Sequence, residues 1–188
     1  KLMAITQNNK NIEIKIDRMN AQGDFQSAQL HAKGIVSANY DYVVTVSTIA
    51  MQAMQKNNTK HIPHIFCAVT DPLKSNGWKS FTEKQNWITG LATPQPVEKT
   101  INYIKQIIPT IKKLGIIWNP SESNSEFCTG LARIACRKLG IELIEKTIAN
   151  VNEIEDAQKS LIKIGIDAFL TSGDATVAQA APSISKYM

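Results

Sequence analysis

The sequence lacks any apolar run close to the roughly 20 residues that a membrane-spanning helix requires. Cysteine is scarce, with only Cys67, Cys128 and Cys136 among 188 residues, and no Cys-x-x-Cys pair or other metal-ligand spacing occurs. An odd number of cysteines argues against a disulfide framework and favours buried thiols. We therefore expect neither a metal site nor a disulfide-stabilised scaffold.

Aromatic residues are also few, at 6% of the chain, and positive charge is not concentrated in any segment. The formal net charge is +5, but the lysines, such as Lys10, Lys56 and Lys159, are dispersed along the chain. Nucleic-acid binding requires a basic face, commonly with interleaved aromatic side chains. We therefore expect the lysines to form a solvated surface and expect no nucleic-acid partner.

Catalytic motifs are missing as well. The sequence contains no phosphate-binding glycine loop, no Gly-x-Ser-x-Gly and no His-Glu-x-x-His. His61 and His64 flank Pro63 where a strand begins, and His31 lies on an amphipathic helix, so a structural role is favoured for all three histidines. These absences weigh against an enzyme, and we expect no cofactor.

What the sequence does contain is a regular alternation of predicted strands and helices. The expected strands cover residues 11–17, 41–46, 62–66, 88–91, 116–118, 141–148 and 167–170. The expected helices cover residues 25–36, 47–54, 97–108, 127–139 and 151–164, with a last helix from the 171–174 turn to residue 188. Residues 1–9 resemble the end of a helix, and residues 73–87 form an irregular segment. This alternation predicts an α/β fold with parallel sheets flanked by helices.

The two runs of alternation meet at the stiff segment Thr93-Pro94-Gln95-Pro96, because each proline restricts both itself and its neighbour. We therefore predict two Rossmann-like lobes with a cleft between them. The first lobe would comprise residues 1–92 and the second residues 93–188. Because Lys1 is not a natural start, we expect the chain to be trimmed.

Three strand-to-helix junctions carry polar residues that can cap a helix: Ser47-Thr48, Asn119 to Ser125, and Ser172 to Asp174. Free N–H groups at a helix start suit an anion, and open α/β sheets bind ligands at such junctions. An acidic residue on the opposing lobe would suit an ammonium group, so the cleft would select a zwitterion such as an amino acid. Any single junction is more simply an ordinary cap, but three in one chain favour the cleft.

Several of these segments, taken together and in order, resemble one known family. They are Asn20-Ala-Gln-Gly-Asp24, Asp41-Tyr-Val-Val-Thr-Val-Ser-Thr48, Ile62-Pro-His-Ile-Phe66, Val69-Thr-Asp-Pro72, Ile88-Thr-Gly90, Gly115-Ile-Ile-Trp-Asn-Pro-Ser-Glu-Ser-Asn-Ser125 and Asp167-Ala-Phe-Leu-Thr-Ser-Gly-Asp174. The set is similar to the tryptophan/tyrosine-type substrate-binding proteins of bacterial ABC transporters, which have the type I periplasmic-binding-protein fold. The resemblance implies two lobes that close on a small ligand. It also implies that a first strand and the last strands lie outside this sequence, so the fold would be incomplete at both ends.

The resemblance also implies a set of ligand contacts. Ser47 and Thr48 would hold the ligand carboxylate from the first lobe, and Asp174, as a solvent-facing residue of the cleft, would meet the ammonium group. Asp71, which precedes Pro72, is either a rim residue or part of an ordinary turn, and the turn is favoured. The second lobe would be lined by Asn119, Glu122, Asn124 and Ser125.

We therefore predict a non-enzymatic, extracytoplasmic solute-binding protein of an ABC importer, located in the periplasm or, with a lipid anchor, at the outer face of the cytoplasmic membrane. Its ligand would be an aromatic or other apolar amino acid, and its partner an ABC permease. One alternative is a ligand-sensing module of a signalling receptor with the same fold. Another is a small α/β enzyme that uses Glu122 and Asp174 as its acid–base pair.

Overall fold

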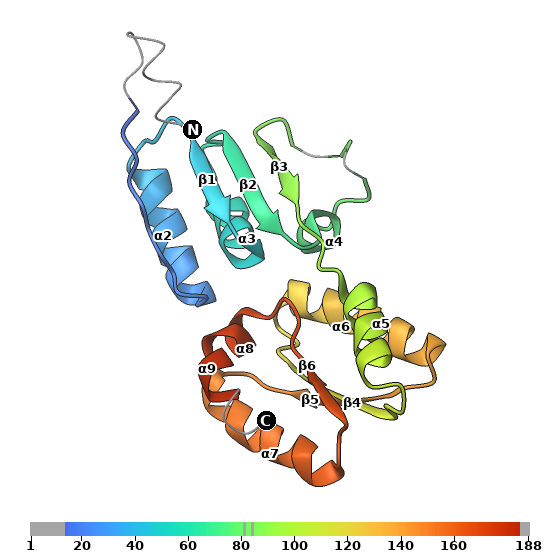
Figure 1. Cartoon of the computed structure of the whole chain (residues 1–188). Coiled ribbons are helices and arrows are strands. Elements are labelled where there is room, and N and C mark those ends of the chain that lie inside the picture. The colour runs from blue at the N-terminus through green and yellow to red at the C-terminus, as the bar shows by residue number, and fades with distance from the viewer. Residues whose placement is uncertain (1–13, 81, 84, 185–188) are drawn as a thin grey trace.

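The computed structural model describes residues 14–80, 82–83 and 85–184 (Figure 1). Its strands form two parallel sheets. The first has the order β1 (Val43–Val46), β2 (His64–Val69) and β3 (Ile88–Ala92). The second has the order β5 (Glu142–Thr147), β4 (Lys113–Trp118) and β6 (Ala168–Leu170). The predicted α/β class with helix-flanked parallel sheets is confirmed.

The helices of the first half are α2 (Phe25–Ser37), α3 (Thr48–Asn57) and α4 (Pro72–Asn76). Each begins at a short polar side chain that accepts a backbone N–H: Asp24 for α2, Ser47 for α3 and Asp71 for α4. Small residues of α2 pack against Ile49, Ala53 and Met54 of α3 to form one apolar cluster. The opposite face of the sheet carries exposed apolar side chains at Val44, Val46 and Ile65.

The second half surrounds its sheet more completely. Helices α5 (Val97–Ile107) and α6 (Ser123–Lys138) share one apolar cluster with alternate residues of β4, namely Leu114, Ile116 and Trp118. Ile117 of the same strand belongs to the cluster with α7 (Ile154–Ile164), α8 (Ala175–Gln179) and α9 (Ala181–Ile184), and the short 3-10 helix η1 (Val151–Glu153) precedes α7. Because side chains alternate across a strand, β4 has both faces buried, as the apolar run of residues 116–118 predicts.

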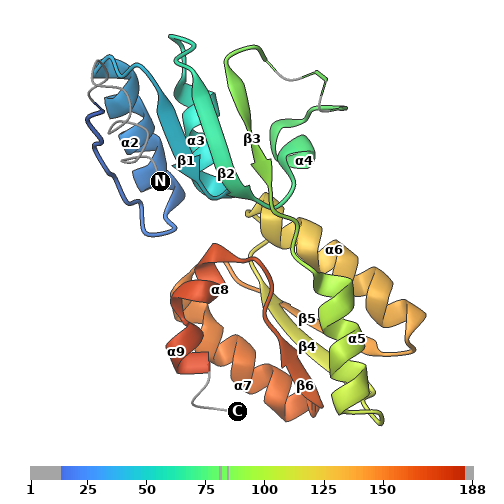
Figure 2. The ribbon, with the colours of Figure 1, turned by 45° about the horizontal axis from the view of Figure 1, so that its top comes forward.

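The segment of residues 93–96 leads from β3 into α5 and so joins the two halves (Figure 2). The division of the chain into lobes at residues 92 and 93 stays a prediction. The predicted burial of the thiols is correct for Cys128 and Cys136, whereas Cys67 is only partly buried. Within the described ranges, no helix combines the length and apolarity needed to cross a membrane.

Three expectations about secondary structure need correction. Residues 14–17 form no strand, although Ile14 and Ile16 alternate with polar residues. β1 pairs with β2, and no described strand lies along its other edge. Residues 1–13, which include the rest of that predicted strand and the predicted helix end, lie outside the described residues. The segment of residues 73–87 is not wholly irregular, because α4 occupies its start and ends at Gly77 in the left-handed conformation.

The last predicted helix is the third correction. It is broken into α8 and α9 at Ala180. Pro182 explains the break, because proline has no N–H to continue a helix but is tolerated in the first turn of a new one. Residues 185–188 lie outside the described range.

Candidate ligand-binding cleft

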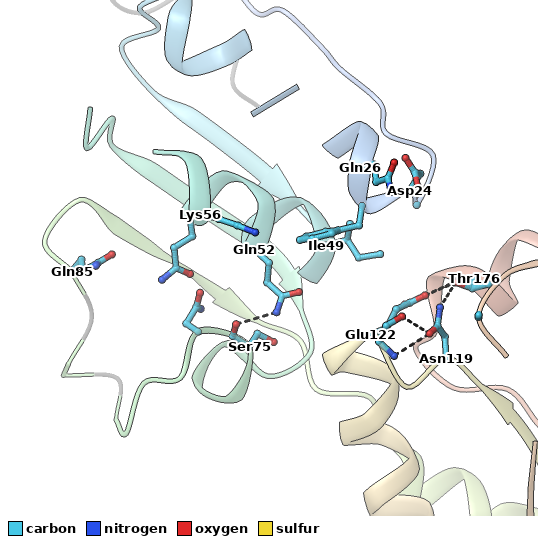
Figure 3. Close-up of a pocket in the computed structure, with 16 residues that line it drawn as sticks. Asp24, Gln26, Ile49, Gln52, Lys56, Ser75, Gln85, Asn119, Glu122 and Thr176 are labelled. Carbon is cyan, nitrogen blue, oxygen red and sulfur yellow. Dashed lines mark hydrogen bonds between the residues drawn. The ribbon is translucent and has the colours of Figure 1, made fainter. Parts of the chain in front are cut away.

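A cavity of about 830 Å³ lies between the two halves. Pockets that bind small molecules typically measure roughly 300–1,000 Å³, so this one could enclose a ligand of amino-acid size. The residues that line it come from both halves (Figure 3). They are Gly23, Asp24, Phe25, Gln26, Ile49, Gln52, Gln55, Lys56, Ser75, Asn76, Gln85, Asn119, Ser121, Glu122, Ala149 and Thr176.

The wall from the first half is mainly one face of α3. Ile49, Gln52 and Lys56 are three and four residues apart, so helical periodicity places them on one stripe, with Gln55 beside it. The start of α2 adds Asp24 and its neighbours. This wall is rich in amides, and Phe25 and Ile49 are its large apolar residues.

The wall from the second half is built at the carboxyl end of β4, where parallel sheets commonly bind ligands. Asn119 follows the strand and organises the loop. Its Oδ1 accepts hydrogen bonds from N (3.0 Å) and Oγ (2.5 Å) of Ser121, and its Nδ2 donates to Oγ1 of Thr176 at 3.0 Å. These bonds hold the side chain in a defined orientation at the cleft.

Glu122 lines the same wall, but its carboxylate is directed to α8. Oε1 accepts from N (2.9 Å) and Oγ1 (2.7 Å) of Thr176. Oε2 accepts from N of Ala175 at 2.8 Å and from Nδ2 of Asn124 at 3.1 Å. Glu122 immediately precedes α6, yet its side chain makes no capping bond to that helix. It therefore satisfies the first N–H groups of a neighbouring helix instead of its own.

Asp174 accepts hydrogen bonds from the loop after β4, from α6 and from its own helix α8. Its carboxylate accepts from N of Asn119 at 2.7 Å, from Oγ of Ser125 at 2.5 Å and from N of Val177 at 2.8 Å. The expectation that Asp174 faces solvent is wrong, since the residue is only 2% exposed. Burial raises the pKa of Asp174 above its ordinary value, and the nearby negative charge of Glu122 acts in the same direction, while the hydrogen bonds from Ser125, Val177 and Asn119 oppose the change.

The remaining predicted contacts lie behind or beside the lining. Ser47 is exposed, has a φ of 97° and caps α3 through its side chain, while Oγ1 of the buried Thr48 accepts from N of Thr70 at 3.5 Å. Asp71 caps α4, which agrees with the favoured interpretation that Asp71 belongs to a turn. Of the predicted site residues, Asn119 and Glu122 line the cleft; Ser47, Thr48, Asp71, Asn124, Ser125 and Asp174 are not among its lining residues. The part of all eight in ligand binding stays a prediction.

Sequence reasoning missed the α3 face and the start of α2. The helical stripe of Ile49, Gln52 and Lys56 could have been read from the sequence. Nothing local distinguishes a stripe that faces a cleft from one that faces solvent. As for metals, within the part of the chain that the structure describes there is no group of three or more histidine, cysteine, aspartate or glutamate residues that could hold an ion.

Polar side chains also connect the two halves beside the cleft. Nε2 of Gln52 donates to the backbone oxygen of Ser75 at 3.0 Å and to Oγ of Ser123 at 3.3 Å. The hydroxyl groups of Ser75 and Ser123 lie 3.1 Å apart. Next to them, Nζ of Lys74 forms an ion pair with Oε2 of Glu126 at 3.3 Å. The first residue of α6 therefore contacts both α3 and α4.

Known proteins share this architecture and about a third of the aligned residues. The tyrosine-binding protein of Clostridioides difficile (strain R20291) is 34% identical over 173 residues, which cover 92% of this chain and 50% of that protein. The chain thus spans about half the length of the curated relative it matches. A conserved domain protein from Vibrio cholerae O1 biovar El Tor str. N16961 is 31% identical with a TM-score of 0.86, over 95% of this chain and 61% of that one.

A second solved structure, the ABC domain from Streptococcus pneumonia in complex with L-Trp, is 27% identical with a TM-score of 0.85, over 94% of this chain and 61% of that one. These similarities confirm the type I periplasmic-binding-protein fold that the sequence resemblance implied. The family model described as ABC transporter substrate binding protein matches residues 4–188. The chain therefore belongs to the ABC transporter substrate-binding protein family.

Proposed function

We propose that this chain forms the binding lobes of an extracytoplasmic solute-binding protein of an ABC importer, and that its cleft holds an aromatic or other apolar amino acid. The observation that carries the proposal is the cleft itself: about 830 Å³ of space between two halves, bordered by helix starts on both sides. Family membership supports the general role of solute binding. An ABC permease at the cytoplasmic membrane would be the partner that receives the ligand.

The start of α6 is the proposed seat of the ligand carboxylate. Ser121 and Glu122 line the cleft just before this 16-residue helix, and the N-cap residue Glu122 makes no side-chain capping bond to it. The first N–H groups of a helix have no acceptor within the helix, and the helix dipole places partial positive charge there. A carboxylate would satisfy both, and the start of α3 after Ser47 and Thr48 would face it from the first half.

The ammonium group and the side chain of an amino acid would also contact residues of these two walls. The negative charges of Asp24 and Glu122 would favour the ammonium group. Phe25 and Ile49 would contact an apolar side chain from the first half. Names of relatives support this ligand class, since one is a tyrosine-binding protein and another was solved with L-Trp. Closure of the lobes would remove the ligand from water.

The hydrogen bonds of Glu122 and Asp174 favour a role in ligand binding over a role as an acid–base pair in catalysis. Glu122 and Asp174 both accept hydrogen bonds from backbone N–H groups that begin α8 or the loop after β4. Carboxylates held this way serve as fixed acceptors. The residues behind the lining, including Thr48, Asn124 and Ser125, would set the shape of the cleft.

A thermal-shift screen tests the proposal. The purified protein would be heated with each amino acid, with nucleosides and small sugars as controls. A ligand at a concentration one hundred times its dissociation constant adds about 2.7 kcal/mol to the free energy of unfolding, which is a clear rise in melting temperature. We expect that rise with one or a few aromatic amino acids. A rise with another class of solute, and none with any amino acid, would overturn the zwitterion proposal.

A further inference from the structure

Gln52 occupies a singular position, because it lines the cleft and also contacts both halves. It lies in the middle of α3 and is half-buried. Its Nε2 reaches the backbone oxygen of Ser75 at 3.0 Å within the first half, and Oγ of Ser123 at 3.3 Å in the second. The side-chain amide therefore ties α3 and α4 to the first residue of α6.

The other end of the same amide is available to a ligand. A backbone carbonyl can only accept a hydrogen bond, so the contact with Ser75 requires that the amide nitrogen of Gln52, and not its oxygen, face α4. Oε1 consequently points to the opposite side, toward the cleft (Figure 3). Among the described residues, no donor makes a hydrogen bond to this oxygen.

We propose that Gln52 contacts the ligand, with Oε1 accepting an N–H of its ammonium group while Nε2 holds Ser75 and Ser123, so that one side chain couples ligand binding to the contact between the halves. This inference rests on the proposed function. It adds a first-half acceptor for the ammonium group. An amide that accepts from a cation becomes a better donor, so binding strengthens the bonds to Ser75 and Ser123.

The coupling acts at the side of the cleft where the halves touch. Ser123 begins α6, the helix whose uncapped start is the proposed carboxylate seat. A ligand whose carboxylate lies at the start of α6 and whose ammonium group donates to Oε1 of Gln52 would therefore contact the surroundings of both Gln52 and Ser123, the two residues that are hydrogen-bonded to each other. The exposed ion pair between Lys74 and Glu126 lies nearby but, with both side chains about half exposed, contributes little.

The test compares two glutamines of one helix. Gln52→Met removes the acceptor and the bridge while keeping a side chain of similar length. Gln55→Met is the matched control, because Gln55 is also half-buried and also lines the cleft, while its side chain makes no hydrogen bond to another described residue. Isothermal titration with L-tyrosine, L-tryptophan and L-phenylalanine would measure affinity. Circular dichroism would establish that both variants are folded.

We expect Gln52→Met to weaken binding about tenfold or more, and Gln55→Met less than about threefold, because a hydrogen bond to a charged group is lost only in the first. 3-Phenylpropionate, which is L-phenylalanine without its ammonium group, should bind wild type and Gln52→Met with nearly equal affinity. Ser123→Ala should weaken amino-acid binding by less than Gln52→Met, and adding it to Gln52→Met should have no further effect, because the bridge is already absent.

The outcomes separate the two proposals. If wild-type protein binds amino acids and Gln52→Met binds them equally well, the role of Gln52 is overturned and the proposed function stands. Equal losses for L-phenylalanine and 3-phenylpropionate would also overturn it, because the ammonium contact would then not exist. If wild-type protein binds none of the amino acids but binds another solute class, both proposals fall.

Discussion

Acidification is expected to destabilise the first half of the protein through His64. This residue begins β2, is only 1% exposed and belongs to the largest fully buried side chains. Its Nε2 lies 2.8 Å from Oγ1 of Thr45, and within the described residues its Nδ1 has no hydrogen-bond partner. Burial disfavours the charged imidazolium and lowers the pKa of His64 from 6.5 to about 4.

The direction and size of the effect follow from proton linkage. In the unfolded chain His64 takes up a proton near its ordinary pKa of 6.5, whereas in the folded protein it stays neutral down to about 4. Between these values the unfolded state holds more protons, so the free energy of unfolding falls as pH falls. A difference of about 2.5 between the two pKa values, at 1.36 kcal/mol per pKa unit, corresponds to about 3 kcal/mol.

Urea unfolding followed by circular dichroism, between about pH 7 and pH 4, would measure this loss. His64→Leu removes the titrating group, so it should be less sensitive to acid than wild type by about 3 kcal/mol over that range, whatever its stability at neutral pH. If His64→Leu loses as much stability on acidification as wild type does, the reasoning is refuted.

Other substitutions test the packing and the cap network by thermal or urea unfolding. Asp174→Ala should lower the free energy of unfolding by about 2–4 kcal/mol, because buried donors at Asn119, Ser125 and Val177 lose their acceptor; wild-type stability would contradict this. Gly90→Ala should cost about 3 kcal/mol or more, because its Cβ would lie 2.1 Å from the backbone oxygen of Phe66. The added Cβ of Gly34→Ala meets nothing within 4 Å, and this position lies inside α2, so the substitution should instead stabilise by about 0.5–1 kcal/mol.

Much of the fold could be predicted because its signals are local. The run of residues 116–118 is apolar and bounded by Gly115 and Asn119-Pro120, and in the structure it belongs to β4, the central strand of its sheet. Residues 14–17 show the limit of this approach. Their alternating pattern is typical of a strand, but a strand also needs a neighbour to bond with, and that depends on residues distant in sequence.

The cleft was predictable in part for the same reason. Asn119 and Glu122 follow a parallel strand, and the carboxyl ends of such strands are where ligand sites form. Gln52 has no comparable signal. Its importance comes from its distance to Ser123, 71 positions further along the chain, which is fixed only once the two halves are placed together.

Glu122 and Asp174 show why a local capping rule does not give the hydrogen-bond partners of an acidic residue at a helix start. The capping rule expects an acidic residue at a helix start to serve that helix, or else to be free for a ligand. In the structure Glu122 accepts from the first N–H groups of α8, while Asp174 accepts from Ser125 of α6 as well as capping its own helix. Because Glu122 is engaged with α8, this N-cap residue makes no side-chain capping bond to α6, and it lines the cleft. Each acid thus accepts hydrogen bonds from the start of the other helix, and this exchange depends on the tertiary placement of the start of α6 beside the start of α8.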